Sequence, residues 1–553
     1  MSDHRVIIVL AACALAAATA GARAGDGAAP LAQWRLAGDA TDSSAGPFNA
    51  RNRGGVAFTA TGPGGVPGAA SFDGRAAHLE VKSDPRLCPG TGDFTLALWA
   101  HTDAAPDGDA GGDLVSMYDE QTRVGFNLSL RTNAGATGTA NVRQLQFGID
   151  AGAEPRWTDE GRPGSAELAF ALAVHEGRLY AGTADNGPGA AGHVFRFDAT
   201  GQWTDCGAPD RCNAVTSLTS YGGALYAASG KYRFAGSAMP ESDNPHVGGG
   251  VFRYEGGDRW SEVGRLPGVE AVGGMAAFNG RLYATSLYKP AGFFRYEPDH
   301  SWTALPVPDG KRVVSLAALN GALWAGSYDG GRVYRYDGSA WEDLGQLGDD
   351  TQTYAFAVHR GRLCVGMWPS GKVFRRGDDG WDDLGRLGDE LEVMGMLVHN
   401  GHLYGGTLPL AAVFRYDGER GWTKTAQLDK TPGAKYRRAW TMAAFDGRLF
   451  CSTLPSGNVH SLETGPCVTF DRELPHGWQH VAAVKRGGIL QLYVNGTPVA
   501  ESRRFDPARF DLANDAPLRI GAGSGAYFHG SLSDVRFYRR ALSESEIHGL
   551  AKP

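Results

Sequence analysis

Aromatic and polar side chains stand next to each other in loops that a repeated motif places at equivalent positions. Flat aromatic faces beside hydrogen-bonding groups suit sugar rings or the anchor residues of a protein partner. We predict a ligand-binding role for Tyr232, Arg233, Glu270, Tyr288, Lys311, Tyr328, Trp368, Glu392, Arg438 and Trp440. The alternative is that these residues only cap one end of the fold. The loop over residues 230–250 is unusually long and could act as a lid.

Histidines and acids do not form a catalytic set in this sequence. His175, His359 and His399 share one position of the repeat. The other copies fill that position with Tyr221, Phe278, Leu319 and Phe445. A position that accepts all these side chains packs a turn, so no catalytic triad is indicated. The neighbouring acids Asp119 and Glu120 point to opposite faces of a strand, which does not provide the facing carboxylates that glycoside hydrolysis requires.

The elements that position these residues follow from the repeat. Each copy begins with a Gly-x-Leu step, and the steps are 40 to 57 residues apart: Gly177, Gly223, Gly280, Gly321, Gly361, Gly401 and Gly447. A unit of about 40 residues built from four short strands is typical of a propeller blade. In each unit we expect an apolar inner strand, such as residues 313–319, then a tight turn and three further strands.

One arginine recurs on the third predicted strand of six units. These residues are Arg196, Arg253, Arg295, Arg335, Arg375 and Arg415. Because they recur uniformly on an outer strand, we predict that their stems pack there while their guanidinium groups stay in water. A tryptophan follows each of them on the outermost strand: Trp203, Trp260, Trp302, Trp341, Trp381 and Trp422.

The last unit lacks a tryptophan strand, and an unassigned one precedes the first unit. Residues 156–161 (Arg-Trp-Thr-Asp-Glu-Gly) are much like residues 202–207 (Gln-Trp-Thr-Asp-Cys-Gly). If residues 156–161 complete the last unit, the ring of units closes without an exposed edge. The sequence therefore predicts a seven-bladed, kelch-like β-propeller over residues 153–465.

The segments on either side of the repeat share a different pattern. Residues 31–36 (Leu-Ala-Gln-Trp-Arg-Leu) and 94–99 (Phe-Thr-Leu-Ala-Leu-Trp) precede the repeat. Residues 490–496 (Leu-Gln-Leu-Tyr-Val-Asn-Gly) and 530–534 (Gly-Ser-Leu-Ser-Asp) follow it. Several such segments alternate apolar and polar residues, as half-buried sandwich strands do. In this order the motifs resemble those of the laminin G-like, or concanavalin A-like lectin, family.

This resemblance implies one jelly roll formed by residues 25–152 and 466–553, and hence an all-β chain with the propeller inserted into the jelly roll. A loop tolerates such an insertion because the two ends of a closed propeller meet. Two tandem half-domains are the alternative, but neither half could bury both sheets alone. The resemblance also implies a structural calcium ion near Asp534, with Asp39 and Asp42 as local partners.

The N-terminal residues predict export. His4 and Arg5 precede an apolar run over residues 6–20, and Ala-Arg-Ala at 22–24 fits a cleavage site, so residues 1–24 are predicted to be a signal peptide. A buried N-terminal helix is the alternative. Six cysteines remain after cleavage, and an oxidising compartment favours disulfide bonds. The pairs Cys206–Cys212 and Cys88–Cys467 are candidates.

Composition narrows the class of function. The net charge is -7, with 53 basic and 60 acidic residues scattered along the chain, and no basic run that would follow a nucleic acid backbone. No second apolar segment predicts a membrane span. We therefore predict a secreted binding protein, extracellular or periplasmic, that recognises a glycan or an extracellular protein through jelly-roll loops or the propeller face. The alternatives are a spacer and a secreted carbohydrate-active enzyme, either a glycoside hydrolase or a polysaccharide lyase, with its site in the propeller funnel.

Overall fold

The computed structural model describes residues 29–65, 68–102, 111–319 and 321–552, so the predicted signal peptide lies outside the described residues. The described part is all-β, with one α-helix, α1 (Glu544–Leu550), whose first turn is held by a capping box of Ser543 and Glu546. Short 3₁₀ turns are η1 (Pro63–Gly65), η2 (Phe234–Ser237), η3 (Pro308–Gly310), η4 (Gly418–Arg420) and η5 (Pro507–Arg509). Across these same ranges, no helix is long and apolar enough to cross a bilayer.

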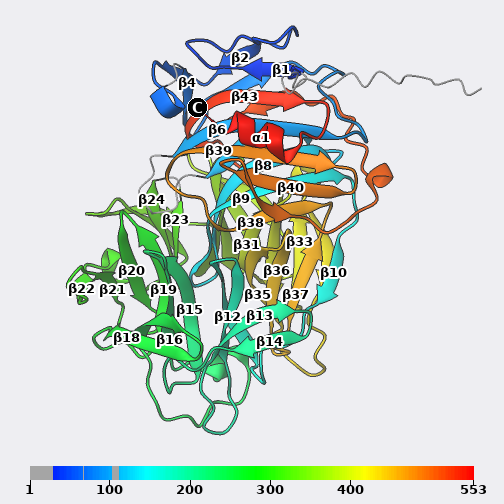
Figure 1. Cartoon of the computed structure of the whole chain (residues 1–553). Coiled ribbons are helices and arrows are strands. Elements are labelled where there is room, and N and C mark those ends of the chain that lie inside the picture. Colours follow the sequence, from blue (N-terminus) through cyan, green and yellow to red (C-terminus); the bar gives the residue numbers. More distant parts are fainter. Residues whose placement is uncertain (1–28, 66–67, 103–110, 320, 553) are drawn as a thin grey trace, which may run out of the picture.

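Two sheets at one end of the molecule face each other and are here called the sandwich (Figure 1). The first sheet has the order β3-β4-β43-β6-β39-β40-β41, with β1 paired to β43. Its strands are β1 (Ala32–Trp34), β3 (Ala57–Thr59), β4 (Ala69–Asp73), β6 (Phe94–Thr102), β39 (Gly477–Arg486), β40 (Ile489–Val494), β41 (Thr497–Glu501) and β43 (His529–Tyr538).

The second sheet of the sandwich has the order β2-β5-β42-β7-β8-β9-β38. Its strands are β2 (Ala50–Arg53), β5 (His78–Val81), β7 (Gly112–Asp119), β8 (Val124–Ala134), β9 (Thr139–Ala151), β38 (Cys467–Glu473) and β42 (Leu518–Ile520). Strand β38 pairs with β9, with Val468 opposite Phe147. Segments more than 300 residues apart in the sequence thus lie side by side in one sheet.

Alternation along β8 assigns each face of this second sheet. Phe126, Leu128 and Leu130 point into the apolar core between the two sheets. The polar residues between them, Asn127 and Ser129 among them, lie on the other face and are also buried. A sheet that buries both faces must be covered on its polar side by another part of the chain.

The repeat region, from β10 to β37, supplies that cover and consists of antiparallel sets of four strands. Five sets are separate sheets, and the other two are joined by one pair, Ala184 opposite Ala214. The first three sets are β11 (Leu168–His175), β12 (Arg178–Ala184), β13 (Val194–Ala199), β14 (Gln202–Asp205); β15 (Ala214–Tyr221), β16 (Ala224–Gly230), β17 (Gly250–Gly256), β18 (Arg259–Arg265); and β19 (Val272–Phe278), β20 (Arg281–Ser286), β21 (Phe293–Tyr296), β22 (Trp302–Leu305).

The later sets have the same strand order, with the inner strand first. They are β23 (Val313–Leu319), β24 (Ala322–Ser327), β25 (Arg332–Tyr336), β26 (Trp341–Gln346); β27 (Gln352–His359), β28 (Arg362–Trp368), β29 (Lys372–Arg376), β30 (Trp381–Arg386); β31 (Glu392–His399), β32 (His402–Leu408), β33 (Ala412–Tyr416), β34 (Trp422–Gln427); and β35 (Arg438–Phe445), β36 (Arg448–Leu454), β37 (Val459–Glu463), β10 (Arg156–Asp159). The inner strands contact one another in the order β11, β15, β19, β23, β27, β31 and β35, and β35 contacts β11 again. They therefore surround an axis.

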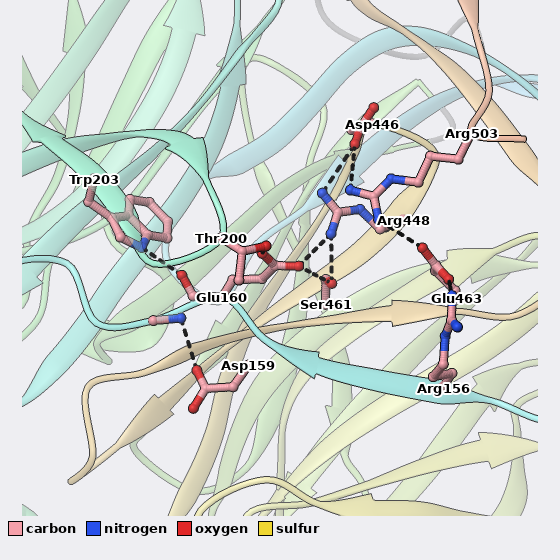
Figure 2. A network of polar contacts seen from close by, with 11 residues as sticks. Arg156, Asp159, Glu160, Thr200, Trp203, Asp446, Arg448, Ser461, Glu463 and Arg503 are labelled. Atoms are coloured by element: carbon pink, nitrogen blue, oxygen red, sulfur yellow. Dashed lines mark hydrogen bonds and ion pairs between the residues drawn. The ribbon is translucent and has the colours of Figure 1, made fainter.

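The predicted closing strand is confirmed. Strand β10 pairs with β37, and Trp157 lies opposite Leu462. Directly after β10, the Glu160 carboxylate is buried and contacts Arg448 of β36, while its Oε2 accepts a hydrogen bond from Thr200 Oγ1 (2.6 Å). Figure 2 shows how this one side chain joins the last set of strands to the first.

Candidate functional site

The turns that follow the inner strands lie against the sandwich. The Asn400 side chain, in the turn after β31, donates hydrogen bonds to the carbonyl oxygens of Ile149 (3.0 Å) and Thr464 (2.7 Å). The Tyr118 hydroxyl of β7 lies 2.6 Å from His402 Nε2 of β32. These contacts cover the polar face of the second sheet. The opposite end of the repeat region, where the inner strands begin, therefore points away from the sandwich.

The hairpin between β8 and β9 enters the axis of the repeat region from the sandwich side. The Thr137 hydroxyl donates to the Thr216 carbonyl of β15 (2.6 Å), and the Thr137 carbonyl accepts from the Met275 amide of β19 (3.1 Å). The Ala136 carbonyl accepts from the Ser315 hydroxyl of β23 (3.0 Å). On the other side, the Ala136 amide donates to Thr441 Oγ1 of β35 (3.0 Å). Four inner strands thus hold the hairpin tip, which leaves the opposite end of the axis as the accessible one.

The predicted ligand-binding residues gather at that opposite end. An apolar group of side chains, here called the axial cluster, contains five of them together with aromatic residues that the sequence did not single out. Its large members are Phe170, Tyr232, Phe234, Tyr288, Tyr328, Tyr354, Trp368, Tyr436 and Trp440. Trp440 Nε1 donates to the Phe170 carbonyl (2.7 Å), and the ring of Phe170 packs edge-on against that of Tyr232. The axial cluster is therefore fixed at its base, while Tyr288, Tyr328, Tyr354, Trp368 and Tyr436 keep part of their surface exposed.

Two ionisable residues are buried beside the axial cluster without complete hydrogen bonding. Glu392 is 3% exposed and Arg438 is 8% exposed. Among the residues that the structure describes, Glu392 Oε1 and Arg438 Nε and Nη1 have no hydrogen-bond partner. Burial raises the pKa of Glu392 to about 7, while the positive charge of Arg438 and the Tyr354 hydroxyl act in the opposite direction. Buried polar atoms in native proteins nearly always have partners, so unpaired atoms on two neighbouring side chains require an explanation.

Repeat position explains why these charges lie on one side of the axis. Glu392, Arg438 and Gln352 are the first residues of their inner strands, and Arg312 directly precedes β23. The equivalent residues of the first three sets are Leu168, Ala214 and Ala271. Sequence reasoning missed Gln352, Arg312 and Tyr354. An alignment of the inner strands by their first residue would have found the first two, because that position carries polar residues in only some of the units.

The remaining predicted residues lie on the rim. Arg233 forms an ion pair with Glu270 (2.7 Å) and stacks over the Tyr288 ring at 4.3 Å from its centroid. Lys311 Nζ donates to the Asp329 carbonyl (3.1 Å). Arg233 and Glu270 are exposed, so their ion pair competes with water. The long loop over residues 230–250 reaches the axial cluster through the buried ring of Phe234.

The recurring arginines pair with acids on their own or the adjacent strand. The six pairs are Arg196–Asp198 (2.8 Å), Arg253–Glu255 (3.1 Å), Arg295–Glu297 (2.8 Å), Arg335–Glu342 (3.3 Å), Arg375–Asp382 (3.3 Å) and Arg415–Asp417 (2.6 Å). Among the histidines at the repeated turn position, burial lowers the pKa of His359 to about 3 and that of His399 to about 4. Neutral buried imidazoles fit the packing role expected for the histidines. The arginine prediction is wrong for Arg415, whose side chain is buried against Asp417 and does not reach water.

The predicted calcium residues contact N–H groups instead of forming a cage. The backbone amide of Gln33 donates to Asp42 Oδ1 (3.0 Å), and Gln33 Nε2 donates to Asp534 Oδ1 (2.7 Å). Arg536 donates to Asp534 Oδ2 (2.6 Å), and Asp39 accepts the amide two residues further on. Within the described ranges, no three His, Cys, Asp or Glu side chains are placed to hold a metal ion. Carboxylates occupied in this way do not fit a calcium ligand set, and calcium binding stays an untested prediction.

The predicted disulfide bonds are not seen among the described residues, whose six cysteines are all unpaired. Cys206 Sγ points to the Thr204 carbonyl (3.7 Å) and Cys212 Sγ to the Ala214 carbonyl (3.5 Å). Cys88 and Cys467 likewise remain unpaired. Burial raises the pKa of Cys212 to about 11, which keeps this thiol protonated and unreactive.

Comparisons with known proteins bear on the sandwich. The family model Laminin_G_3, the concanavalin A-like lectin/glucanases superfamily, matches residues 422–548, which run from β34 of the repeat region through β43 into α1. Adhesion G-protein coupled receptor V1 of Danio rerio is 28% identical over 104 residues, which are 18% of this chain. The chain spans 2% of the length of that relative.

Solved structures show weaker likeness. Catalytically inactive virginiamycin B lyase from Staphylococcus aureus, with quinupristin, is 12% identical and aligns over 56% of this chain and 99% of that one, at a TM-score of 0.44. The WD40 beta propeller domain of Doa1 is 12% identical, over 56% of this chain and 97% of that one, at a TM-score of 0.40. The extracellular domain of a one-component system from B. thetaiotaomicron is 12% identical, over 61% and 52%, at a TM-score of 0.40. TM-scores at this level carry no inference about function.

Proposed function

We propose that the chain is a secreted binding protein in which a seven-bladed, kelch-like β-propeller (residues 153–465) is inserted between the two parts of one laminin G-like jelly roll (residues 25–152 and 466–553). The pairing of β9 with β38 supports one continuous sandwich. The pairing of β10 with β37, together with the ring of inner strands, supports a closed propeller. The family match over residues 422–548 supports the jelly roll and an extracellular binding role.

The ligand site in this proposal is the exposed end of the axial cluster. The observation that carries it is the pair Glu392 and Arg438, buried beside partly exposed aromatic rings and left with unpaired polar atoms. A glycan or a protein loop would supply the missing partners and pack on the rings. The polar face of the second sandwich sheet is taken up by the repeat region. This favours the propeller end over that face as the binding surface.

A glycan array and a pull-down from extracellular material, both with the full chain, test this proposal. We expect saturable binding that Trp368→Ala weakens at least about tenfold, because central aromatic residues dominate binding energy. The matched control is Trp478→Ala on β39 of the sandwich, which should bind as the wild type does. Loss of binding in Trp478→Ala with full binding in Trp368→Ala would instead assign the ligand to the sandwich.

The alternative function is a carbohydrate-active enzyme, hydrolase or lyase, with its site at the same place. The observation that favours it is the pKa of Glu392 near 7, which suits a group that gives and takes a proton at neutral pH. Product release from a polysaccharide panel, abolished by Glu392→Gln, would establish turnover. Saturable binding without any product supports the binding protein.

A further inference from the structure

One positively charged side chain beside the axial cluster lacks a counter-ion, and this indicates the charge of the ligand. Of the polar residues at the start of the inner strands, Arg312 is occupied by Asp329 (2.8 Å). Gln352 accepts the Tyr354 hydroxyl. Arg438 and Glu392 lie on adjacent inner strands, yet Arg438 Nε and Nη1 and Glu392 Oε1 find no hydrogen-bond partner in the described part of the chain. A buried guanidinium with free N–H donors therefore lacks a fixed counter-ion.

Glu392 does not act as that counter-ion in mildly acidic solution. The groups that face it are Arg438 from β35, Tyr354 from β27 and Tyr328 from the end of β24. Both tyrosines have a pKa well above 10 and stay neutral. Because burial raises the pKa of Glu392 to about 7, its carboxyl is largely protonated in mildly acidic solution. Arg438 then carries an uncompensated positive charge.

Further positively charged side chains lie near the exposed end of the axial cluster. Lys435 Nζ stacks over the Tyr436 ring at 4.9 Å, and the Arg438 guanidinium lies 5.7 Å from the same ring. Lys311 Nζ, which donates to the Asp329 carbonyl oxygen, adds a further positive charge. Positive charge at this end of the axis attracts an anion, and a guanidinium binds a carboxylate with strong, charge-assisted hydrogen bonds.

The aromatic rings beside Arg438 indicate which chemical group the rest of the ligand carries. The ring centroids of Tyr328 and Tyr354 lie 4.4 Å apart. Trp368 and Tyr436 belong to the same axial cluster. Flat aromatic faces next to hydroxyl groups suit the apolar face and hydroxyls of a pyranose ring. Building on the proposed binding function, we propose that the site binds a saccharide whose carboxylate is held by Arg438 and whose hydroxyl groups contact Glu392.

The test compares three probes on the full chain by calorimetry at pH 6. They are a uronic acid tetrasaccharide, the same tetrasaccharide with its carboxyls reduced to alcohols, and a sulfated neutral tetrasaccharide. We expect the acidic sugar to bind about tenfold or more tightly than either of the others. Equal binding of the reduced or the sulfated sugar overturns the carboxylate assignment while the binding function stands. If no saccharide binds and the array and pull-down are also empty, the proposed function itself fails.

Two variants locate the contact. Arg438→Gln should lose about tenfold or more of the affinity for the acidic sugar and leave that for the reduced sugar within about twofold. Glu392→Gln needs no new cavity and provides a second route if Arg438→Gln does not fold. In the wild type, affinity for the acidic sugar should fall from pH 6 to pH 8, as Glu392 ionises beside Arg438. Glu392→Gln should remove that pH dependence, and its persistence in the variant would contradict the role of this pair.

Discussion

Replacing Glu392 by glutamine should stabilise the protein at alkaline pH and leave its stability at acidic pH nearly unchanged. Burial raises the pKa of this carboxyl from its ordinary value of 4.5 to about 7 in the folded chain. The folded state therefore binds the proton more tightly than the unfolded state. Its contribution to stability is fully present below pH 4.5 and is lost as the pH rises through about 7.

The size of the effect follows from the two pKa values. At about 1.4 kcal/mol for each pKa unit between the folded and unfolded chain, an ionised Glu392 costs about 3 kcal/mol above pH 7. Glutamine keeps the shape of the side chain but carries no charge, so it avoids this cost. The variant should match the wild type within about 1 kcal/mol at pH 5 and exceed it by up to about 3 kcal/mol at pH 8.5.

Urea unfolding of both proteins at the two pH values measures the difference. The matched control is Glu270→Gln, which removes an exposed carboxylate from the same rim and should change the free energy of unfolding by less than about 1 kcal/mol at either pH. If Glu392→Gln destabilises the chain equally at pH 5 and pH 8.5, then Glu392 is not a carboxyl held protonated by burial. Arg438 would then have a counter-ion in mildly acidic solution, and the site would not select an anionic ligand.

Further predictions concern the joints of the fold. In Gly138→Val the new Cβ would lie 2.2 Å from a carbonyl oxygen of β15, so the hairpin should leave the axis. Thermal unfolding should then show two transitions, or the free energy of unfolding should fall by about 2 kcal/mol or more. The control Gly380→Val, with open space around the new side chain, should behave as the wild type. Glu160→Gln removes one buried carboxylate from Arg448, which keeps its ion pair with Asp446, and should cost about 1–3 kcal/mol of unfolding free energy in urea, against less than about 1 kcal/mol for the more exposed Glu463→Gln. A thiol reagent should titrate six cysteines per mature chain in denaturant without reductant, and fewer would indicate a disulfide bond. Adding calcium after chelation should leave the melting temperature unchanged, and a rise of several degrees would establish the calcium site.

Local patterns predicted the strands because each strand of the repeat carries its own signal. The predicted inner strand at residues 313–319 is β23, and the tryptophan segment at 156–161 pairs with the last set, as its likeness to residues 202–207 indicated. Alternation and turn glycines act over a few residues, so the sequence displays them directly.

The contacts between the two parts of the chain carried no such signal. The hairpin tip Gly-Ala-Thr-Gly at residues 135–138 reads as an ordinary turn, and its partners in the axis lie 79 to 305 residues further on. The polar residues of β8 are buried under the repeat region. Small side chains and polar strand positions do not say which distant segment covers them.

The sequence predicted several residues of the candidate site but not the protonation of Glu392, because burial depends on distant segments. Aromatic residues in equivalent loops pointed to Tyr328 and Trp368, but the protonation of Glu392 depends on burial by elements from four different units. For Cys206 and Cys212, the sequence suggested a bond that the structure does not show. A spacing of six residues permits a disulfide bond, whereas the strands on either side turn the two thiols to different carbonyl oxygens.

Hydroxyl-radical footprinting of the protein with its selected saccharide measures where the ligand lies. Oxidation of Trp368 and Tyr354 should fall when the saccharide is bound, while that of Trp478 on the sandwich stays constant. Protection of Trp478 with unchanged oxidation of Trp368 and Tyr354 would contradict a binding site at the axis.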